Sequence, residues 1–533
     1  MQYPLYNASM DEIVKHFGGP FIEHCLNLAP NEFSPTIKLS DKQQEVLSAM
    51  QHIVLEAQAH QDPFITHLHV SQRVGYSSQL GASLANLWRT HCGGDLAQSR
   101  SDDAVENALL ALAVEAYPQF LLPPAPRPNV HAPSPLFYGH PQSQEIAKQI
   151  LLDPTLSRLF PEAPEASTYE GDGMEIQSTA VWSNGTSGTM QLGMLPAALL
   201  RSGAIKLAET STIDDYFDGV RRALRHVRSL ASKKATKVPA LIGLASLELV
   251  GVDRLEFKGG LLRLPTVRDI ELLMGAENVV AVLEVEVNLQ LLSVSPFNPI
   301  QADDDSFMRR FEQNRPRFEK FSREFRRTID LACLTMLLAS APGQYIAPVE
   351  MATAVHNPAT LGMSAGMSPY KYPVSTFGTT PVDRESAASI EFWASKVAEH
   401  PLSLDMTMRR LLSAVSRRLD PLDSFIDAVI CWENMFGTGE GEVSFRVSGA
   451  IAHLMEPSDP AARKKLFDEV KAMYGTRSKL VHGAKEPSPR DSVDQMMRAV
   501  DISIQCLRLL YEKPHLLAVG SSGERGRMLL LGA

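Results

Sequence analysis

The chain has 533 residues, of which 61 are acidic and 51 are basic, giving a formal net charge of −10. This length is too great for one hydrophobic core, so we expect two or three domains. The acidic balance excludes a general nucleic-acid-coating protein, because such proteins usually carry a basic excess, but it leaves room for a local basic site that acts on RNA.

Cysteine usage and hydropathy predict a cytoplasmic protein without a membrane partner. The cysteines are scattered and form no C-x-x-C pair, which fits thiols in a reducing compartment better than disulfides or a zinc site. The N-terminal segment has neither a basic start nor an apolar run, so we expect no signal peptide. No uncharged apolar stretch approaches the ~20 residues of a membrane span. We expect no metal and no cofactor.

Residues 1–122 are predicted to form an N-terminal helical region. Ser40 is a suitable N-cap for a helix in which apolar residues recur at helical spacing from Val46 to Ala57. Asp102 to Tyr117 has the same pattern. The proline-rich segment 122–135 cannot continue a helix, and it predicts a linker or an extended crossing segment.

Residues 136–300 are predicted to form an α+β middle domain. Asp214 to Ser229 has helical periodicity, whereas Leu283 to Leu291 alternates apolar and polar residues as a strand does. Leu255–Phe257 and Leu261–Leu264 flank Lys258-Gly259-Gly260, which predicts a hairpin.

Residues 301–402 are predicted to be a helical connector with a long loop. Asp303-Asp304-Asp305 is an acidic helix start. Residues 342–381 are rich in glycine, proline and methionine, and they predict a loop that is functional or partly disordered.

Residues 403–533 are predicted to form a C-terminal antiparallel helical bundle, so the fold class is mainly α and multidomain. Five amphipathic segments separated by breakers are expected, and they cover Met408–Leu419, Asp423–Phe436, Glu442–Met455, Ala461–Val481 and a segment after Pro489 that extends to Tyr511.

Arg477 is the unusual residue of the fourth segment. It lies between Met473 and Val481 on an otherwise apolar stripe, where a charge is costly unless it is paired or lies at an interface. His482 follows five residues later at the predicted helix end, and Gly483 can cap that end. Two copies related by a two-fold axis can bring two such arginines and histidines into one pocket.

The segment from Tyr474 to Gly483 resembles the R-x4-H signature of HEPN domains. The upstream residues 432–436 (WENMF), Gly441-Glu442 and Ser444-Phe445-Arg446 occur in the order of the Apea-like HEPN subgroup. The resemblance covers roughly Ser403 to Tyr511. Ser478 follows the arginine, where many HEPN ribonucleases carry Asn, Asp or His, and serine suits the Apea-like pattern.

The resemblance implies a metal-independent endoribonuclease that works as a homodimer, of the kind found in bacterial antiviral defence or toxin systems. Arg477 and His482 are the implied catalytic residues. Histidine titrates near neutrality and can move the proton of a ribose 2′-OH, and arginine can hold a phosphate. The implied supporting residues are Ser478, Glu433, Glu442, Arg446 and Tyr474, and for the charged ones an inter-helix salt bridge is the plain interpretation. The alternative is a non-catalytic HEPN module for dimerisation, sensing or scaffolding, and in either case the regulatory trigger is unknown.

Two basic runs are candidate RNA-binding surfaces, each with a solvated or packed helix face as the alternative. The denser run has few acids near it and comprises Arg221, Arg222, Arg225, Arg228, Lys233 and Lys234. The second run, from Arg309 to Arg327, alternates basic residues with phenylalanines, a composition that can bind single-stranded RNA by stacking and phosphate contact.

Three further features are weaker candidates. The glycine-rich segment Ser183 to Gly193 lacks the G-K-[ST] ending of a phosphate-binding loop, so a turn is expected. His67 and His69 face one side if they lie on a strand, but no third metal ligand is nearby. His453 is expected to be a structural histidine.

Overall fold

The computed structural model describes residues 10–532 apart from positions 35, 61, 124–140, 162, 164, 169–177, 186, 208–210, 267–268, 270–271, 274–277, 297–303, 361–363, 368–374, 376, 438–441 and 483–486. Helices contain 61% of the described residues, which confirms the prediction of a mainly α, multidomain protein. Within the described ranges, no helix is both long enough and apolar enough to cross a membrane. Most of the predicted proline-rich linker lies outside the described residues.

The chain forms two compact units, each built from several segments. Unit 1 comprises residues 1–238, 287–319 and 355–364, and unit 2 comprises residues 239–286, 320–354 and 365–533. The four regions predicted from the sequence are continuous segments of the chain, and their boundaries stay predictions.

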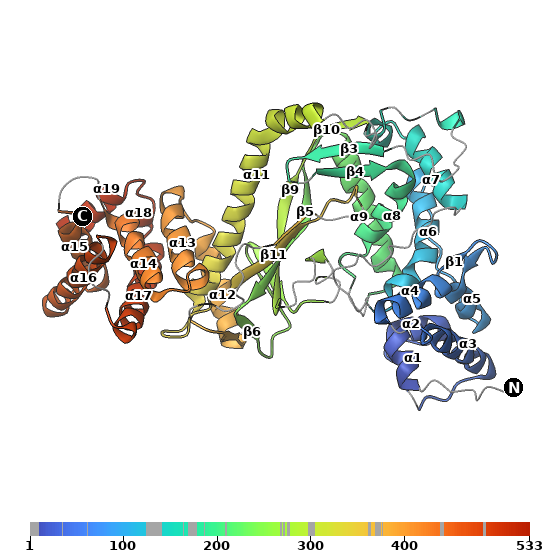
Figure 1. The fold of residues 1–533 in the computed structure, drawn as a ribbon, viewed down its shortest axis with the longest axis horizontal. Coiled ribbons are helices and arrows are strands. Elements are labelled where there is room, and N and C mark those ends of the chain that lie inside the picture. The colour runs from blue at the N-terminus through green and yellow to red at the C-terminus, as the bar shows by residue number, and fades with distance from the viewer. Residues whose placement is uncertain are drawn as a thin grey trace. The chain divides into compact units, whose positions relative to one another are not determined.

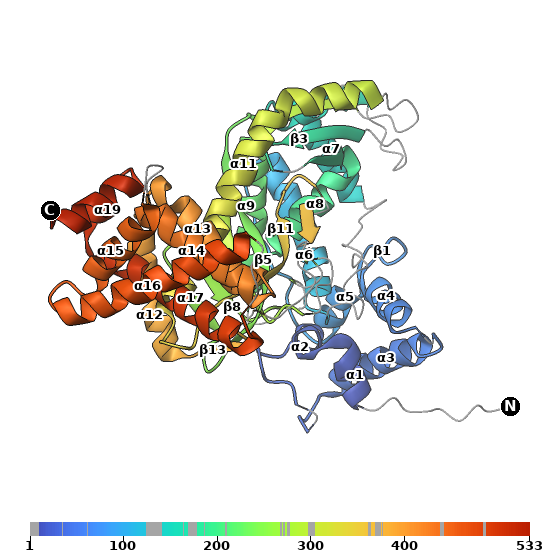
Figure 2. The ribbon, with the colours of Figure 1, turned by 60° about the vertical axis from the view of Figure 1, so that its left-hand side comes forward.

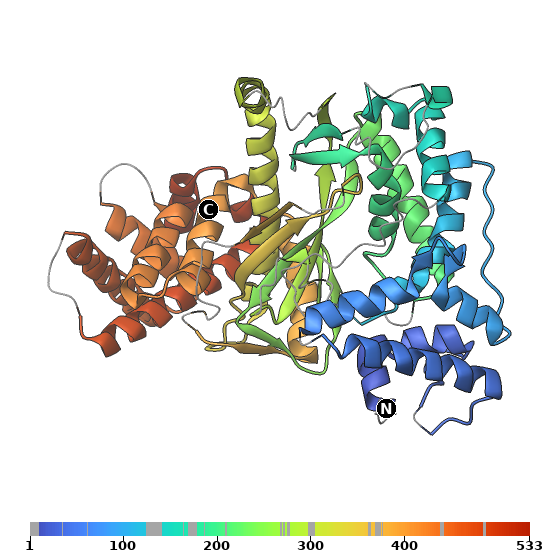
Figure 3. The ribbon, with the colours of Figure 1, turned by 45° about the vertical axis from the view of Figure 1, so that its right-hand side comes forward.

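Unit 1 contains most of the N-terminal helices and a small antiparallel sheet (Figure 3). Its helices are α1 (Met10–Phe17), α2 (Gly19–Leu26), α3 (Asp41–Ala57), α4 (Pro63–Val74), α5 (Leu84–His91), α6 (Ala104–Phe120), α7 (Pro141–Leu152), α8 (Leu195–Gly203) and α9 (Ile213–Ala231), with short 3-10 turns η1 (Leu156–Leu159), η2 (Ala166–Thr168) and η3 (Leu192–Met194). Its strands are β1 (Tyr76–Ser77), β2 (Ala82–Ser83), β3 (Ser178–Ser183), β4 (Ser187–Gln191) and β10 (Leu291–Pro296), and β3 pairs antiparallel with both β4 and β10.

Local sequence signals explain where these helices begin. The Ser40 hydroxyl accepts a hydrogen bond from the backbone N–H of Gln43, whose side chain accepts from the Ser40 N–H, so the predicted N-cap is part of a capping box. Asp103 caps α6 and Thr212 caps α9, each through its side-chain oxygen. The predicted starts of these helices, at residues 41, 102 and 214, are therefore confirmed to within two residues.

Helices α8 and α9 cross at two glycines. A Cβ atom added at Gly219 of α9 would lie 2.1 Å from the carbonyl oxygen of Gly203 in α8, and one added at Gly203 would lie 2.6 Å from Val220. Backbone atoms cannot move aside as a flexible side chain can, so the two helices approach as closely as their main chains allow.

We predict that Gly219→Ala destabilises the protein, although alanine favours helices over glycine by about 1 kcal/mol. The backbone clash outweighs that gain, and overpacking of this kind costs about 1–3 kcal/mol. Gly475→Ala is the matched control, because Gly475 also lies inside a helix but its added Cβ would meet nothing within 4 Å. Urea unfolding should show a lower midpoint for Gly219→Ala and an equal or higher midpoint for Gly475→Ala; the reverse order would contradict the packing argument.

Most strands of a six-stranded sheet belong to unit 2, and the strand order is β12-β11-β5-β9-β8-β7. The strands are β5 (Thr236–Ala245), β7 (Arg254–Phe257), β8 (Gly260–Arg263), β9 (Ala281–Leu289), β11 (Val349–Val355) and β12 (Ser364–Met367), and a separate parallel pair joins β6 (Leu247–Leu249) to β13 (Thr380–Val382). The predicted hairpin is confirmed, because β7 and β8 pair antiparallel around Lys258-Gly259. The predicted alternation is also confirmed, since Val285, Val287 and Leu289 are buried and Glu286 and Asn288 are exposed.

The prediction of a single long loop over residues 342–381 is wrong, because β11, β12 and β13 lie within it. β11 is an interior strand between β12 and β5. Five of its seven residues are buried, and they are Val349, Met351, Ala352, Ala354 and Val355. A strand covered on both faces has no apolar–polar alternation, so the sequence of β11 carries no period-two signal of a strand.

The C-terminal part of unit 2 is helical, and its orange-to-red helices lie together in both views (Figures 1 and 2). The helices that complete the chain are α11 (Asp304–Ala339), α12 (Arg384–Val397), η4 (Leu402–Leu404), α13 (Asp405–Leu412), the π-helical turn η5 (Ser413–Arg417), α14 (Pro421–Phe436), α15 (Val443–Met455), α16 (Pro460–Val481), α17 (Pro489–Glu512), α18 (Pro514–Leu517) and α19 (Ser522–Leu531). α14 packs on α17, and α15 packs on α16 and α19. All five predicted C-terminal helices are present.

One residue of the first predicted helix lies elsewhere than expected. Leu419, the last residue of the first predicted amphipathic segment, is 57% exposed, because the π-helical turn η5 changes the helical phase and the chain leaves the helix at Arg418. The buried carboxylate of Asp427 accepts hydrogen bonds from Arg410 at 2.7 Å, Ser413 at 2.8 Å and Arg418 at 2.9 Å. These polar contacts, which join α13 and η5 to α14, accompany the change of phase.

Candidate functional site

Helix α16 carries the candidate catalytic residues near its end. The Asp459 carboxylate accepts hydrogen bonds from the N–H groups of Ala461 and Ala462, and Pro460 fills the first helical position. Leu466, Val470 and Met473 are buried at helical spacing. The sequence therefore starts the helix with a cap and holds it to the bundle by one apolar stripe.

The last two turns of α16 leave the apolar core. After Met473, every residue of the helix is half-buried or exposed, and Val481 is 53% exposed. The expectation that Val481 shares the buried face is therefore wrong. Arg477 lies in this emerging segment, with 23% of its side chain exposed, so it stands at the edge of the bundle rather than inside it.

Glu433 of α14 brings two residues of α16 together. The Tyr474 hydroxyl donates a hydrogen bond to Glu433 Oε1 at 2.6 Å, and Arg477 Nη1 lies 3.6 Å from the same oxygen. Burial, followed by the hydrogen bond to Glu433, raises the pKa of Tyr474 to about 12, so the phenol stays protonated and acts as the donor. The inter-helix salt bridge considered from the sequence therefore exists between Glu433 and Arg477.

His482 follows the last residue of α16 and is exposed. Its backbone N–H donates to the carbonyl oxygen of Ser478 at 3.2 Å, which completes the last helical turn. The imidazole is thus presented at the helix end. Gly483, the predicted capping residue, lies outside the described residues.

The other predicted supporting residues lie on α16 and at the start of α15. Ser478 is half-buried in the last turn of α16. Glu442 precedes α15 with a positive φ of 44°, and its carbonyl oxygen accepts a hydrogen bond from the N–H of Arg446. His453 lies near the end of α15, where burial lowers the pKa of its imidazole. The contacts described above join Glu433, Tyr474 and Arg477 as one cluster.

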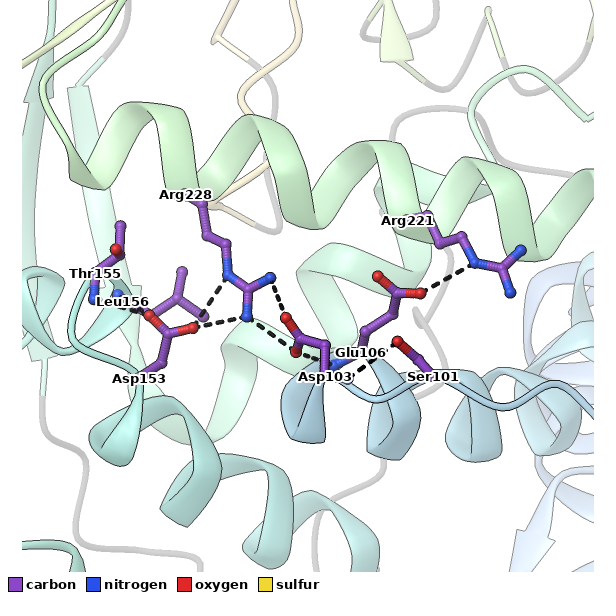
Figure 4. Close-up of polar contacts among 8 residues, drawn as sticks. All are labelled: Ser101, Asp103, Glu106, Asp153, Thr155, Leu156, Arg221 and Arg228. Atoms are coloured by element: carbon purple, nitrogen blue, oxygen red, sulfur yellow. Dashed lines mark hydrogen bonds and ion pairs between the residues drawn. The ribbon is translucent and has the colours of Figure 1, made fainter.

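The denser basic run is divided into paired residues on α9 and exposed residues on α9 and just after it. Figure 4 shows Arg228 reaching between Asp103 and Asp153, with Nη1 2.6 Å from Asp103 and Nη2 2.7 Å from Asp153. Arg221, seven residues earlier, pairs with Glu106 at 3.1 Å. These two arginines attach α9 to the neighbouring segments of unit 1. The four residues of the run that remain exposed are Arg222, Arg225, Lys233 and Lys234.

We predict that Arg228→Ala destabilises unit 1 by about 1–2 kcal/mol, because it leaves two carboxylates without their shared donor in a partly exposed site. The hydrogen bond from Arg228, which outweighs the opposing effect of burial, lowers the pKa of Asp103. Arg225→Ala, on the exposed side of the same helix, is the control and should leave the unfolding midpoint unchanged. Equal midpoints for the two variants in thermal unfolding would refute this structural role.

The second basic run lies on α11, and several of its members have structural partners. Arg326 makes a two-pronged ion pair with Glu350 at 2.5 and 2.8 Å, and Arg327 pairs with Asp405 at 3.1 Å. The rings of Phe311 and Phe318 stack on each other, with centroids 5.7 Å apart. These contacts favour the packing interpretation for this part of the run.

The weaker candidates are resolved by secondary structure. His67 and His69 lie on α4, not on a strand, so the premise that placed them on one side is wrong, and His69 Nε2 lies 3.6 Å from Glu56. Across the described ranges, no cluster of three or more His, Cys, Asp or Glu residues could hold a metal ion. The glycine-rich segment turns at Asn184-Gly185 between β3 and β4, as predicted, and then continues as β4 and η3.

Comparisons with known proteins add no relative. No protein-family model, curated protein or solved structure matches this chain.

Proposed function

We propose that this protein is a metal-independent endoribonuclease whose catalytic residues are Arg477 and His482. The observation that carries the proposal is the end of α16, where a half-buried arginine and an exposed histidine five residues later emerge from a helical bundle. The R-x4-H spacing and its surroundings resemble an Apea-like HEPN domain, and the bundle of α13 to α19 supports that resemblance.

The residue types fit cleavage by the ribose 2′-OH. His482 takes the 2′-OH proton as the oxygen attacks phosphorus, and the imidazolium so formed gives that proton to the departing 5′-oxygen. Arg477 stabilises the charge that develops on the phosphoryl oxygens. The products are a 2′,3′-cyclic phosphate and a 5′-hydroxyl, and the step consumes no water and no cofactor.

A second copy of the chain completes the proposed site. Apolar side chains on α16 and α17 remain exposed, with Val481 at 53%, Val493 at 39% and Met497 at 37%. Exposed apolar residues next to a charged pair are typical of an interface. A two-fold axis through this surface would place two arginines and two histidines in one cleft.

The proposed setting is cytoplasmic bacterial defence or a toxin system, in which roughly the first 400 residues sense a trigger or restrain the nuclease. The proposed RNA-binding surface comprises Arg222 and Arg225 on α9 and Lys233 and Lys234 just after it, and all four are exposed. Arg221 and Arg228, which the sequence placed in the same surface, are committed to ion pairs and are proposed to support it indirectly.

The second candidate is a non-catalytic HEPN module that dimerises and scaffolds. The pairing of Arg477 with Glu433 favours it, because the negative carboxylate beside the arginine offsets the positive charge that would attract a phosphate.

Incubation of the purified full-length protein with mixed-sequence RNA in EDTA tests the proposal. We expect cleavage that leaves cyclic phosphate ends, with DNA and 2′-O-methyl RNA left intact because they have no free 2′-OH. Protein carrying Arg477→Ala, purified in parallel, controls for contaminating nuclease. Equal cleavage by both preparations, or no cleavage together with a stable dimer, would favour the scaffolding module.

A further inference from the structure

The contacts of Glu433 are uneven. A single oxygen, Oε1, accepts the Tyr474 hydroxyl at 2.6 Å and faces Arg477 Nη1 at 3.6 Å. The first distance is that of a strong hydrogen bond to a charged acceptor, and the second is an ion pair beyond hydrogen-bonding reach. The carboxylate therefore binds the phenol closely and the guanidinium loosely.

The guanidinium of Arg477 consequently keeps donor capacity in reserve. Its Nε is buried and has no hydrogen-bond partner among the described residues. Arginine offers five N–H donors, and carboxylate and phosphate oxygens match its fork in pairs. An arginine close to a carboxylate but not joined to it in a two-pronged pair is poised to accept a second anion.

Other arginines of the same unit show the contrast. Arg326 and Glu350 form a two-pronged pair at 2.5 and 2.8 Å, and Arg498 and Glu469 form one at 2.7 and 3.0 Å. In those pairs, both carboxylate oxygens face one guanidinium. At Glu433 the hydroxyl of Tyr474 occupies the oxygen that faces Arg477, so the carboxylate is pinned and the equivalent fork is not made.

We propose that Tyr474 and Glu433 are positioning residues that together set how readily Arg477 receives the phosphodiester. Glu433 holds the guanidinium loosely and competes with the phosphate by charge, and Tyr474 prevents Glu433 from saturating it. This inference rests on the proposed ribonuclease function, because it assigns the phosphate of RNA as the anion that Arg477 receives.

The two positioning residues should therefore have opposite effects on RNA affinity. Tyr474→Phe removes the hydroxyl and frees Glu433 to form a two-pronged pair with Arg477, which competes with the phosphate. Glu433→Gln keeps an acceptor for Tyr474 and removes the competing charge, so the phosphate meets a stronger cation. A purely structural contact would instead shift the affinity in one direction in both variants.

The test measures binding of a fluorescein-labelled, mixed-sequence 2′-O-methyl RNA by anisotropy, together with cleavage of unmodified RNA. Relative to wild type, we expect Tyr474→Phe to weaken binding and Glu433→Gln to tighten it, each by about threefold to tenfold for a partly exposed charged hydrogen bond. Both effects should vanish when Arg477→Ala is added, because the coupling passes through that side chain. Glu469→Gln, which breaks the neighbouring pair with Arg498, is the matched control and should leave affinity unchanged.

Each outcome has one meaning. If wild type neither binds the labelled RNA nor cleaves RNA, the proposed function fails and this inference fails with it. If wild type cleaves RNA, the function stands. The positioning role is then overturned if the two variants change RNA affinity in the same direction or leave it unchanged. It is also overturned if their effects on affinity persist when Arg477→Ala is present. Thermal unfolding of each variant confirms that binding is measured on folded protein.

Discussion

His482→Ala is expected to reduce RNA cleavage by about 10²–10⁴-fold, the usual contribution of a positioned general acid or base. The side chain is exposed, and its contribution to the helix end is made by the backbone N–H, which alanine retains. The substitution should therefore remove the proton-transfer group and leave α16 intact. Initial rates on a fluorescence-quenched RNA in EDTA, measured beside the thermal unfolding midpoint, provide the check.

His453→Ala is the matched control for this experiment. His453 lies near the end of α15 in the same bundle, and burial lowers the pKa of its imidazole, so it is expected to be neutral and structural. Its replacement should leave the cleavage rate close to that of wild type. Unchanged cleavage by His482→Ala, or an equal loss in both variants, would remove His482 from the catalytic role.

Arg525→Ala is expected to lower the free energy of unfolding by about 3–5 kcal/mol, since it removes several hydrogen bonds from a charged donor and leaves a cavity. Arg525 of α19 is fully buried, and it donates to the carbonyl oxygens of Leu516 at 3.0 Å, Met435 at 2.9 Å and Val519 at 2.6 Å. Burial lowers the pKa of the guanidinium to about 10, so it remains charged at neutral pH.

The environment of Arg525 explains how a buried charge is stabilised by carbonyl oxygens. Met435 is next to the last residue of α14, and Leu516 is next to the last residue of α18. Carbonyl groups at helix C-termini carry partial negative charge and lack helical partners. The arginine thus satisfies the ends of two helices at once and fixes α19 to the bundle.

Close packing around α19 adds to the expected cost. A Cβ atom added at Gly526 would lie 2.6 Å from the carbonyl oxygen of Phe436, so the helix has little space in which to adjust. Lysine should not rescue the variant, because a point charge cannot reproduce the planar fork. Arg527→Ala is the control, because Arg527 is exposed and pairs only locally with Glu524. If Arg525→Ala and Arg527→Ala unfold at the same urea concentration, the role of Arg525 in fixing α19 to the bundle is contradicted.

Some helices and strands could be predicted from the sequence because the signals that specify them are short-range. Ser40 and its capping box, the alternation of β9 and the glycine hairpin between β7 and β8 each lie within a few residues of the chain. Where burial affects both faces, as in β11, or where the helical phase changes, as in η5, no local pattern distinguishes the element.

The candidate site shows the same division. The sequence singled out Glu433, Tyr474 and Arg477 one by one, but the hydrogen bond between Tyr474 and Glu433 joins residues 41 positions apart. The basic run on α9 was visible as charge, whereas its division was not, because the carboxylates that hold Arg221 and Arg228 come from residues 103, 106 and 153. The sequence shows that a basic residue is present, but carboxylates from distant parts of the chain decide whether that residue is held in an ion pair.

By itself, the sequence determined that this protein is mainly helical, where several of its helices begin, and that an arginine and a histidine stand five residues apart near one helix end. Only the tertiary structure decided that Arg477 leaves the core beside Glu433, that β11 is an interior strand, and that Arg525 is a buried link between helix ends. The reason is physical. Periodicity and capping depend on neighbours within about one or two turns, whereas the partner of a buried charge is set by which distant segments fold against it.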